Sequence, residues 1–229
     1  MTALYPDVED GGMWVASDGV SYVVGDDWTT YTEVDGLVAN DVTAITLDSQ
    51  NRAWFGSNTG LSIWNGSTFF NLTAENGLPS EEITSLLAAD DSVWIGTREG
   101  GFYRFEKNQL QVFNITNADL PSDDVLALAI DDEGVLLVGT DLGLARFADG
   151  EVTLVAELGA VSVVALATAP NGEIWAATEN DGVWRYDGEI WRRFDADNYL
   201  PETVTRILVD SSGGVWFGGE SGGVVRYAE

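Results

Sequence analysis

The sequence predicts an all-β protein, a β-propeller of six blades. Three observations predict it: a short aromatic strand recurs about every 40 residues, strand-like segments with a period of two surround each copy, and turns rich in Asp, Ser, Asn and Gly separate the strands. A single twisted four-stranded sheet cannot cover both of its faces, so repeated sheets of this size are expected to pack radially. No segment has helical periodicity, which excludes helical repeats of similar length.

The recurring aromatic strand is expected to be the second strand of each blade. Its second position holds tryptophan in five copies, and Leu136 replaces the tryptophan in the fourth copy. The six copies are Met13–Ser17, Ala53–Ser57, Val93–Thr97, Val135–Thr140, Ile174–Thr178 and Val215–Gly219.

Three further strands complete the expected antiparallel blade. Aliphatic and β-branched runs such as Val42–Leu47 and Val204–Val209 predict the first strand. Gly101–Phe105 exemplifies the third strand, and Thr68–Leu72 and Ile190–Phe194 exemplify the fourth.

The repeat predicts a single domain over residues 1–229. In the first copy, a degenerate first strand is expected from Thr2 to Asp7. The sixth copy stops before a fourth strand, so we expect the last blade to lack its outer strand or to be completed from outside this chain. The expected blades cover approximately residues 2–35, 36–77, 78–118, 119–157, 158–198 and 199–229.

Composition excludes several classes of function. Ten basic residues against 38 acidic ones give a net charge of −28, so nucleic acids and anionic membranes should be repelled. The absence of histidine removes the commonest general base and the commonest ligand of catalytic zinc. No apolar run is long enough to span a bilayer. We therefore expect no enzyme active site, metal, cofactor, nucleic-acid partner or membrane insertion by this segment.

One copy carries the motifs of a known family. Gly77-Leu78-Pro79-Ser80 precedes the apolar run Ile83–Leu87, and Val93–Thr97 is followed by Gly100–Phe105. In these motifs the sequence resembles the two-component regulator propeller repeat. The resemblance covers essentially the whole chain; it is strongest in copies two, three and six and weakest in copy four. The resemblance implies the extracytoplasmic sensing region of a bacterial signalling protein, with a periplasmic or extracellular location. It also implies an oligosaccharide or another small extracellular ligand, dimerisation through the rim or the open last blade, or both.

Two sets of residues recur at fixed repeat positions, which indicates packing rather than ligand binding. The arginines follow glycine in the third strand and are expected to pair with an Asp of a neighbouring blade or to stack on an aromatic neighbour. The sets are the second-strand tryptophans Trp14, Trp54, Trp94, Trp175 and Trp216, and the arginines Arg104, Arg146, Arg185 and Arg226.

Ligand binding is expected where the loops vary between copies while the strands hold them rigidly. The turn between the second and third strands and the loop between blades share one end of a blade, and their irregular residues are the candidate ligand-binding positions. From the turns these are Arg98, Glu99, Asp141, Glu179, Asn180, Asp181 and Glu220; the loops between blades add Asp41, Glu81, Asp123 and Glu202.

Three hypotheses of function follow. The first is a non-enzymatic recognition domain of a signalling protein. The second is a scaffold, fragment or engineered repeat propeller without a ligand. The third is a hydrolase or lyase that uses carboxylates alone, against which the missing histidine counts.

Overall fold

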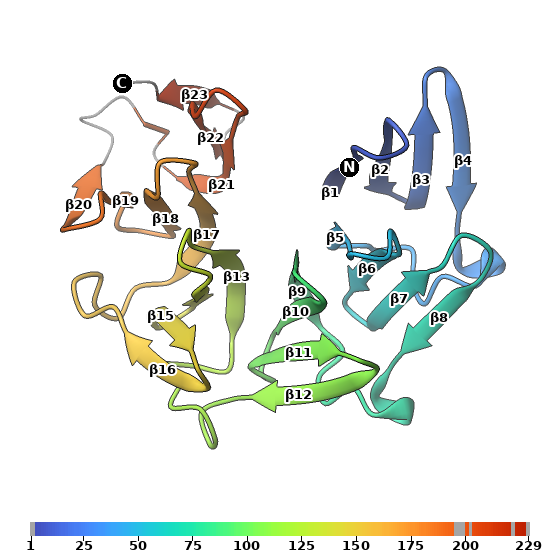
Figure 1. Ribbon diagram of the computed structural model, residues 1–229, viewed down its shortest axis with the longest axis horizontal. Helices are drawn as coiled ribbons and strands as arrows, with labels where there is room; N and C mark the ends of the chain where they lie inside the picture. Colours follow the sequence, from blue (N-terminus) through green and yellow to red (C-terminus); the bar gives the residue numbers. More distant parts are fainter. Residues whose placement is uncertain (1–2, 195–199, 202, 221–222, 228–229) are drawn as a thin grey trace. The chain divides into compact units, whose positions relative to one another are not determined.

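The computed structural model describes residues 3–194, 200–201, 203–220 and 223–227. Over these residues the protein is an all-β, six-bladed propeller of antiparallel sheets with four consecutive strands each, and the sheet of the last blade has three strands (Figure 1). This confirms the predicted fold class. The chain forms two compact units, Met1–Val112 and Phe113–Glu229.

The first unit contains blades 1 to 3. In each blade the strands follow one another outward, and the first strands β1, β5 and β9 are neighbours (Figure 1). Blade 1 has β1 (Ala3–Asp7), β2 (Gly12–Ser17), β3 (Gly19–Val24) and β4 (Asp27–Tyr31); blade 2 has β5 (Ala44–Leu47), β6 (Ala53–Ser57), β7 (Gly60–Trp64) and β8 (Phe69–Leu72); blade 3 has β9 (Ile83–Ala89), β10 (Ser92–Thr97), β11 (Phe102–Glu106) and β12 (Gln109–Phe113).

The second unit contains blades 4 to 6, with the first strands β13, β17 and β21 as neighbours. Blade 4 has β13 (Val125–Ile130), β14 (Leu136–Thr140), β15 (Gly143–Ala148) and β16 (Glu151–Leu154); blade 5 has β17 (Val163–Thr168), β18 (Ile174–Thr178), β19 (Val183–Tyr186) and β20 (Trp191–Phe194); blade 6 has β21 (Val204–Val209), β22 (Val215–Gly219) and β23 (Val224–Tyr227).

The second strands are the best-buried segments. All residues of β6, β14 and β18 are buried, and each strand contacts the first strand of the next blade, β9, β17 or β21. The first strand β13 instead alternates between buried and half-buried residues, which is the period-two pattern of a strand with one face in the core.

Aromatic residues of consecutive blades interlock in the cores. The Trp14 ring lies 5.0 Å from the Phe55 ring of the next blade, edge to face. Trp54 and Phe105 repeat this contact between blades 2 and 3 at 5.1 Å. Such edge-to-face pairs add to the free energy of burying the rings.

The register corrects one assignment made from the sequence. Trp94, Trp175 and Trp216 each lie opposite the arginine of the third strand, and in blade 4 Leu137 lies opposite Arg146. Leu137, not Leu136, therefore takes the tryptophan position. The observed strand begins at Leu136, whereas the copy predicted from the sequence begins one residue earlier, at Val135.

Short helical turns were not predicted. The described residues include two single-turn 3₁₀ helices, η1 (Glu33–Asp35) and η2 (Ala74–Asn76), in the loops that lead into blades 2 and 3. Each ends at a glycine, Gly36 or Gly77, with a φ of 107°, a conformation that favours glycine. This accounts physically for the glycine of the Gly-Leu-Pro motif.

Most predicted strands lie within one or two residues of the observed ones. Val204–Val209 and Ala53–Ser57 agree at both ends, whereas the predicted Val42–Leu47 begins at Ala44. The first strand of blade 1 runs over Ala3–Asp7, and Thr2 lies outside the described residues.

Candidate functional site

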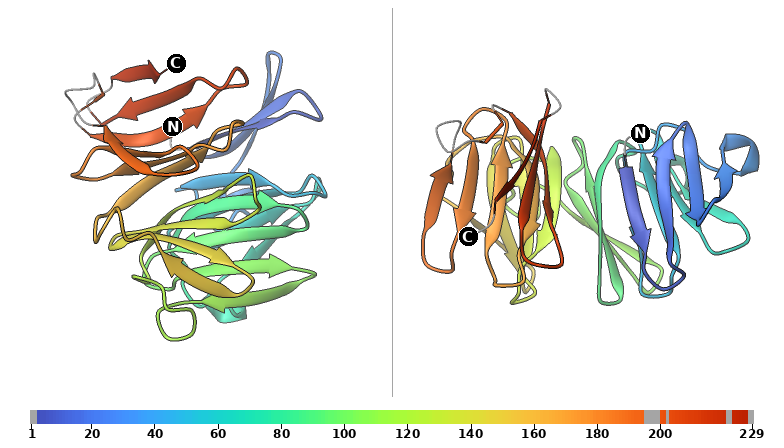
Figure 2. Two further views of the ribbon diagram at one scale, coloured as in Figure 1. Left: turned by 60° about the vertical axis from the view of Figure 1, so that its left-hand side comes forward. Right: turned by 90° about the horizontal axis from the view of Figure 1, so that it is seen from above.

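Antiparallel strands place the turns of each blade at two opposite ends of its sheet (Figure 2). The turns between strands one and two and between strands three and four share one end, which we call the first-turn end. The turn between strands two and three and the loop between blades share the other, which we call the loop end. The sequence placed the candidate ligand-binding residues at the loop end.

At the loop end of blade 3, Arg98 is held by the loop that precedes its blade. Its Nε lies 2.7 Å from Oε1 of Glu82, and both side chains are about half exposed. The backbone N–H of Arg98 donates to the Glu82 carbonyl, and the Ser80 hydroxyl donates to the Arg98 carbonyl. Glu99 follows with a φ of 59°.

The corresponding turns in blades 4, 5 and 6 dock on their own preceding loops in the same way. The N–H groups of Asp141, Glu179 and Glu220 donate to loop carbonyls at 3.1, 2.9 and 3.2 Å. Oδ1 of Asp141 is buried without a hydrogen-bond partner among the described residues. In blade 5, Asn180 is exposed, while Asp181 pairs with Arg193.

These positions lie in the turns of four blades. Arg98 and Glu99 belong to the first unit and the other five to the second, where Glu179, Asn180 and Asp181 share one turn. Of the loop positions, Glu202 lies outside the described residues. Ligand binding at the loop end stays a prediction.

Four of the five second-strand tryptophans are buried. Trp14, Trp54, Trp94 and Trp175 are at most 8% exposed, whereas Trp216 in the last blade is 37% exposed. The buried rings fill the space between sheets or within their own blade.

The recurrent third-strand arginines stack on the tryptophans of their own blades. The guanidinium groups of Arg104, Arg185 and Arg226 lie 5.3, 5.5 and 5.6 Å from the centroids of the tryptophan rings. Their acidic partners also lie in the same blade, not in the neighbouring blade that the sequence had suggested. Arg146 pairs with Asp131 at 2.7 Å, and Arg226 pairs with Asp210 at 3.1 Å.

A recurrent aspartate that sequence analysis treated as a simple turn residue organises the first-turn end. In blade 2, Asp48 accepts hydrogen bonds from the N–H groups of Gln50 and Arg52 (3.0 Å each), from Arg52 Nε at 2.6 Å and from Trp54 Nε1 at 2.8 Å. Asp210 makes the same contacts with its turn and with Trp216, and adds Arg226. The signal that could have found it is the aspartate six residues before the tryptophan.

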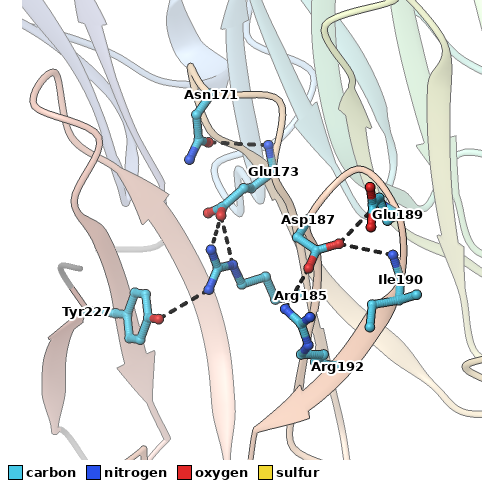
Figure 3. A network of polar contacts seen from close by, with 8 residues as sticks. All are labelled: Asn171, Glu173, Arg185, Asp187, Glu189, Ile190, Arg192 and Tyr227. Carbon is cyan, nitrogen blue, oxygen red and sulfur yellow. Dashed lines mark hydrogen bonds and ion pairs between the residues drawn. The ribbon is translucent and has the colours of Figure 1, made fainter.

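Blades 1, 3 and 5 lack an aspartate at this position, and Figure 3 shows the contacts that take its place in blade 5. Ala169 occupies the aspartate position, and Nε1 of the buried Trp175 has no hydrogen-bond partner among the described residues. Arg185 binds Glu173 instead, and its NH1 donates to the Tyr227 hydroxyl of blade 6 at 3.2 Å. Glu173 thus replaces the missing carboxylate for the arginine but not for the indole.

A small polar pocket of about 180 Å³ lies at the first-turn end between blades 2 and 3. Because ligand pockets usually have roughly 300–1,000 Å³, this one can hold only part of a larger ligand. We call it the Arg52 pocket; its lining residues are Asp48, Ser49, Gln50, Arg52, Asp91, Val93, Phe105, Lys107 and Asn108.

The walls of the Arg52 pocket combine charge, hydrogen-bonding groups and one aromatic ring. Arg52 stacks 5.7 Å from the centroid of Trp54, whose ring contacts Phe105 of the pocket wall. Lys107, the only lysine of the chain, comes from the turn between β11 and β12. Its hydrogen bond to Glu106 raises the pKa of Lys107 above its ordinary value, so its charge is retained at neutral pH.

The second unit has a related groove between the first turns of blades 5 and 6. Pro170 and Asn171 form one wall, and Ser211, Ser212 and Arg226 are among the residues of the other. The hydrogen bonds from Ser212 and Trp216 hold the pKa of Asp210 well below its usual range, so a negative charge lies beside Arg226 at the wall of this groove.

Among the described residues, no group of three or more histidine, cysteine, aspartate or glutamate residues could hold a metal ion. The same part of the chain has no helix long and apolar enough to cross a membrane.

Comparison with known proteins supports the family resemblance. Residues 36–59 match the model of the two component regulator propeller. No curated protein matches the chain in sequence. An extracellular domain assigned to a hybrid two component system of B. thetaiotaomicron has a similar fold, with a TM-score of 0.81 and 24% identity over 96% of this chain and 32% of its own.

Two other solved structures show how widely this fold is shared. A second such domain from the same organism has a TM-score of 0.71 and 18% identity over 100% of this chain and 38% of its own. A catalytically inactive histidine-to-alanine variant of virginiamycin B lyase from Staphylococcus aureus, with quinupristin, has a TM-score of 0.59 and 13% identity over 81% of this chain and 69% of its own.

The chain spans about a third of the length of the two extracellular domains that it resembles. At these identities the likeness shows the fold. The chain is thus a β-propeller of which residues 36–59 match the model of the two component regulator propeller.

Proposed function

We propose that the chain is a non-enzymatic recognition propeller in the sensing region of a bacterial two-component-type signalling protein, located in the periplasm or outside the cell. The observation that carries this proposal is the fold likeness, over 96% of the chain, to the extracellular domain of a hybrid two component system. The match to the regulator propeller repeat supports it from the sequence.

The Arg52 pocket is the proposed recognition site. Serine, glutamine and asparagine side chains line it together with Asp91 and the Phe105 ring. Hydroxyl, amide and carboxylate groups beside an aromatic ring are suited to hydrogen bonding with a polyhydroxylated ligand. An oligosaccharide, or another small polar extracellular ligand, is therefore the proposed occupant.

Thermal unfolding against a panel of oligosaccharides and divalent cations tests the recognition function. A ligand that binds only the folded state stabilises it by about 2.7 kcal/mol at 100 times its dissociation constant, or roughly 5 to 10 °C for a domain of this size. A selective shift with one glycan supports recognition. If no ligand of the panel changes the melting temperature, the proposal is contradicted and a scaffold without a ligand is favoured. A shift in melting temperature with calcium alone would favour cation binding at the aspartate turns.

A lyase is the second candidate, because the fold also resembles that of virginiamycin B lyase. The inactive form of that lyase carries a histidine-to-alanine substitution, and this chain contains no histidine. Incubation of this chain with quinupristin, the compound present in that lyase structure, should therefore give no turnover. Measurable turnover that scales with protein concentration would overturn the non-enzymatic assignment.

Self-association is a further part of the proposal. In blade 6, β23 has no fourth strand beside it among the described residues, and an unpaired strand edge can add a strand from another chain. We expect light scattering to show a homodimer, through this edge or the rim. A mass that stays monomeric at all concentrations would remove this prediction and leave the recognition function intact.

A further inference from the structure

We infer that the Arg52 pocket recognises an oxyanion, a carboxylate or a sulfate group, carried by its ligand. The inference rests on the proposed recognition function and names the chemistry of the same site. It is drawn from the geometry of one arginine, whose guanidinium is fixed from one side and open on the other.

Arg52 is held in place by its own turn. Its Nε donates to Asp48 Oδ2 at 2.6 Å, its backbone N–H donates to Asp48 Oδ1 at 3.0 Å, and its guanidinium carbon lies 5.7 Å from the Trp54 centroid. Among the described residues, no hydrogen bond or ion pair engages its NH1 and NH2. The side chain is 29% exposed, so these two nitrogens belong to a guanidinium that solvent can reach.

A planar guanidinium with two unengaged terminal nitrogens matches the two oxygens of a carboxylate or sulfate. Because the Nε contact and the tryptophan already fix the side chain, binding an oxyanion would order few additional bonds. Arg52 therefore presents a preorganised donor pair at the wall of a pocket.

The carboxylate next to Arg52 cannot serve as the oxyanion for these two nitrogens. Four hydrogen bonds from the turn, the Arg52 Nε and the Trp54 indole engage the oxygens of Asp48, whose side chain is 7% exposed. Asp48 fixes the arginine through its Nε, and this contact leaves the NH1 and NH2 groups of Arg52 without a hydrogen bond among the described residues.

A second cation lines the same pocket. Lys107 is 82% exposed and comes from the neighbouring blade. In a chain with ten basic residues and a net charge of −28, the only lysine and the open arginine line one pocket. Asp48 and Asp91 line the pocket as well, and Lys107 pairs with Glu106, so the lining charges balance. A balanced lining opposes an anionic group less than the acidic remainder of the chain does, and the unengaged nitrogens of Arg52 supply the preference.

The related groove of the second unit provides an internal comparison. Arg226 uses both Nε and NH2 on Asp210, and NH2 also donates to the Ser212 hydroxyl. The carboxylate of its own blade thus engages both Nε and NH2 of Arg226. The two grooves have similar positions in their blades, and what distinguishes the Arg52 pocket is that the terminal nitrogens of its arginine have no such partner among the described residues.

Calorimetric titration with matched ligands tests the inference. The probes are an oligogalacturonide, the neutral galactose oligomer of the same length and linkage, and a sulfated form of that neutral oligomer. They are titrated into the full chain and into Arg52→Gln, Arg52→Lys and Lys107→Gln. Arg206→Gln is the matched control, because it removes the same charge from an exposed arginine that does not line the pocket.

The acidic probe is expected to bind the unmodified chain and the Arg206→Gln control, and the neutral oligomer to bind at least about tenfold more weakly. Arg52→Gln should weaken binding by roughly tenfold to a hundredfold, the range for hydrogen bonds to a charged group. Arg52→Lys keeps the positive charge but lacks the planar pair of N–H donors, so it should retain only part of the affinity for the acidic probe. The sulfated probe shows whether a carboxylate is required.

Three results would overturn the inference and each bears differently on the proposed function. Equal binding of acidic and neutral oligomers would keep recognition and remove the oxyanion. Acidic binding that Arg52→Gln leaves unchanged, with the variant folded by circular dichroism, would place the oxyanion elsewhere. If none of these probes binds while another glycan raises the melting temperature, only the oxyanion inference is contradicted. If no ligand binds at all, both the inference and the proposed recognition function are contradicted.

Discussion

Replacing Asp48 with alanine should destabilise the protein by about 3 kcal/mol. The substitution removes the acceptor of the Trp54 indole N–H, and Trp54 is 0% exposed, so no solvent replaces the lost bond. A buried donor without a partner costs roughly 1–3 kcal/mol, and two turn N–H groups and the Arg52 contact lose their acceptor as well. At roughly 2 to 4 °C per kcal/mol for a chain of this size, the melting temperature should fall by about 6 to 12 °C.

Urea-induced unfolding followed by tryptophan fluorescence measures this change directly. Asp26→Ala is the matched control, since it removes the same charge from an exposed turn and should change the free energy of unfolding by less than about 0.5 kcal/mol. If Asp48→Ala unfolds at the same urea concentration as Asp26→Ala, the aspartate does not organise the first-turn end.

Three further predictions concern stability. Ala169→Asp should raise the free energy of unfolding by about 1 kcal/mol, because it offers the unpaired Trp175 indole an acceptor; a lower urea midpoint would show that Glu173 excludes a second carboxylate. Arg104→Ala should lower the melting temperature, because it removes the stack on Trp94, and an unchanged melting temperature would contradict this role. Burial, and then the hydrogen bond to the Asp7 carboxylate, raise the pKa of Tyr22 to about 12 in the folded protein. The free energy of unfolding should therefore fall as pH rises from about 10 to 12, because the unfolded chain loses this proton first. Tyr22→Phe should reduce that fall in a pH series of urea midpoints.

The repeat could be predicted from the sequence because its strongest signals are local. A second-strand tryptophan followed by small residues marks most copies, and turn residues mark the ends of the strands. Blade 4 shows the limit of this reasoning. Without a tryptophan, no residue at the position itself marks it, and the pairing of Leu137 with Arg146, a property of the folded sheet, corrects the alignment.

The candidate site was harder to predict, because it depends on contacts between blades. Turn composition identifies Asp48 as a turn residue but not as the acceptor of the Trp54 indole. Arg52 falls outside the recurrent third-strand arginines, and Lys107 reaches the same pocket from the next blade. Variation between loops directed attention to Arg98 and the loop end, where the structure spreads the candidates over several blades.

The central claim, recognition at the Arg52 pocket, is tested most directly by an indole ¹⁵N–¹H spectrum of the chain with and without the glycan that raises its melting temperature. The Trp54 indole lies against Arg52, so its resonance should shift on binding, while that of Trp175 in the other unit should stay in place. Shifts confined to the backbone amides of Arg98 and Glu99, with Trp54 unmoved, would contradict the account and place the ligand at the loop end.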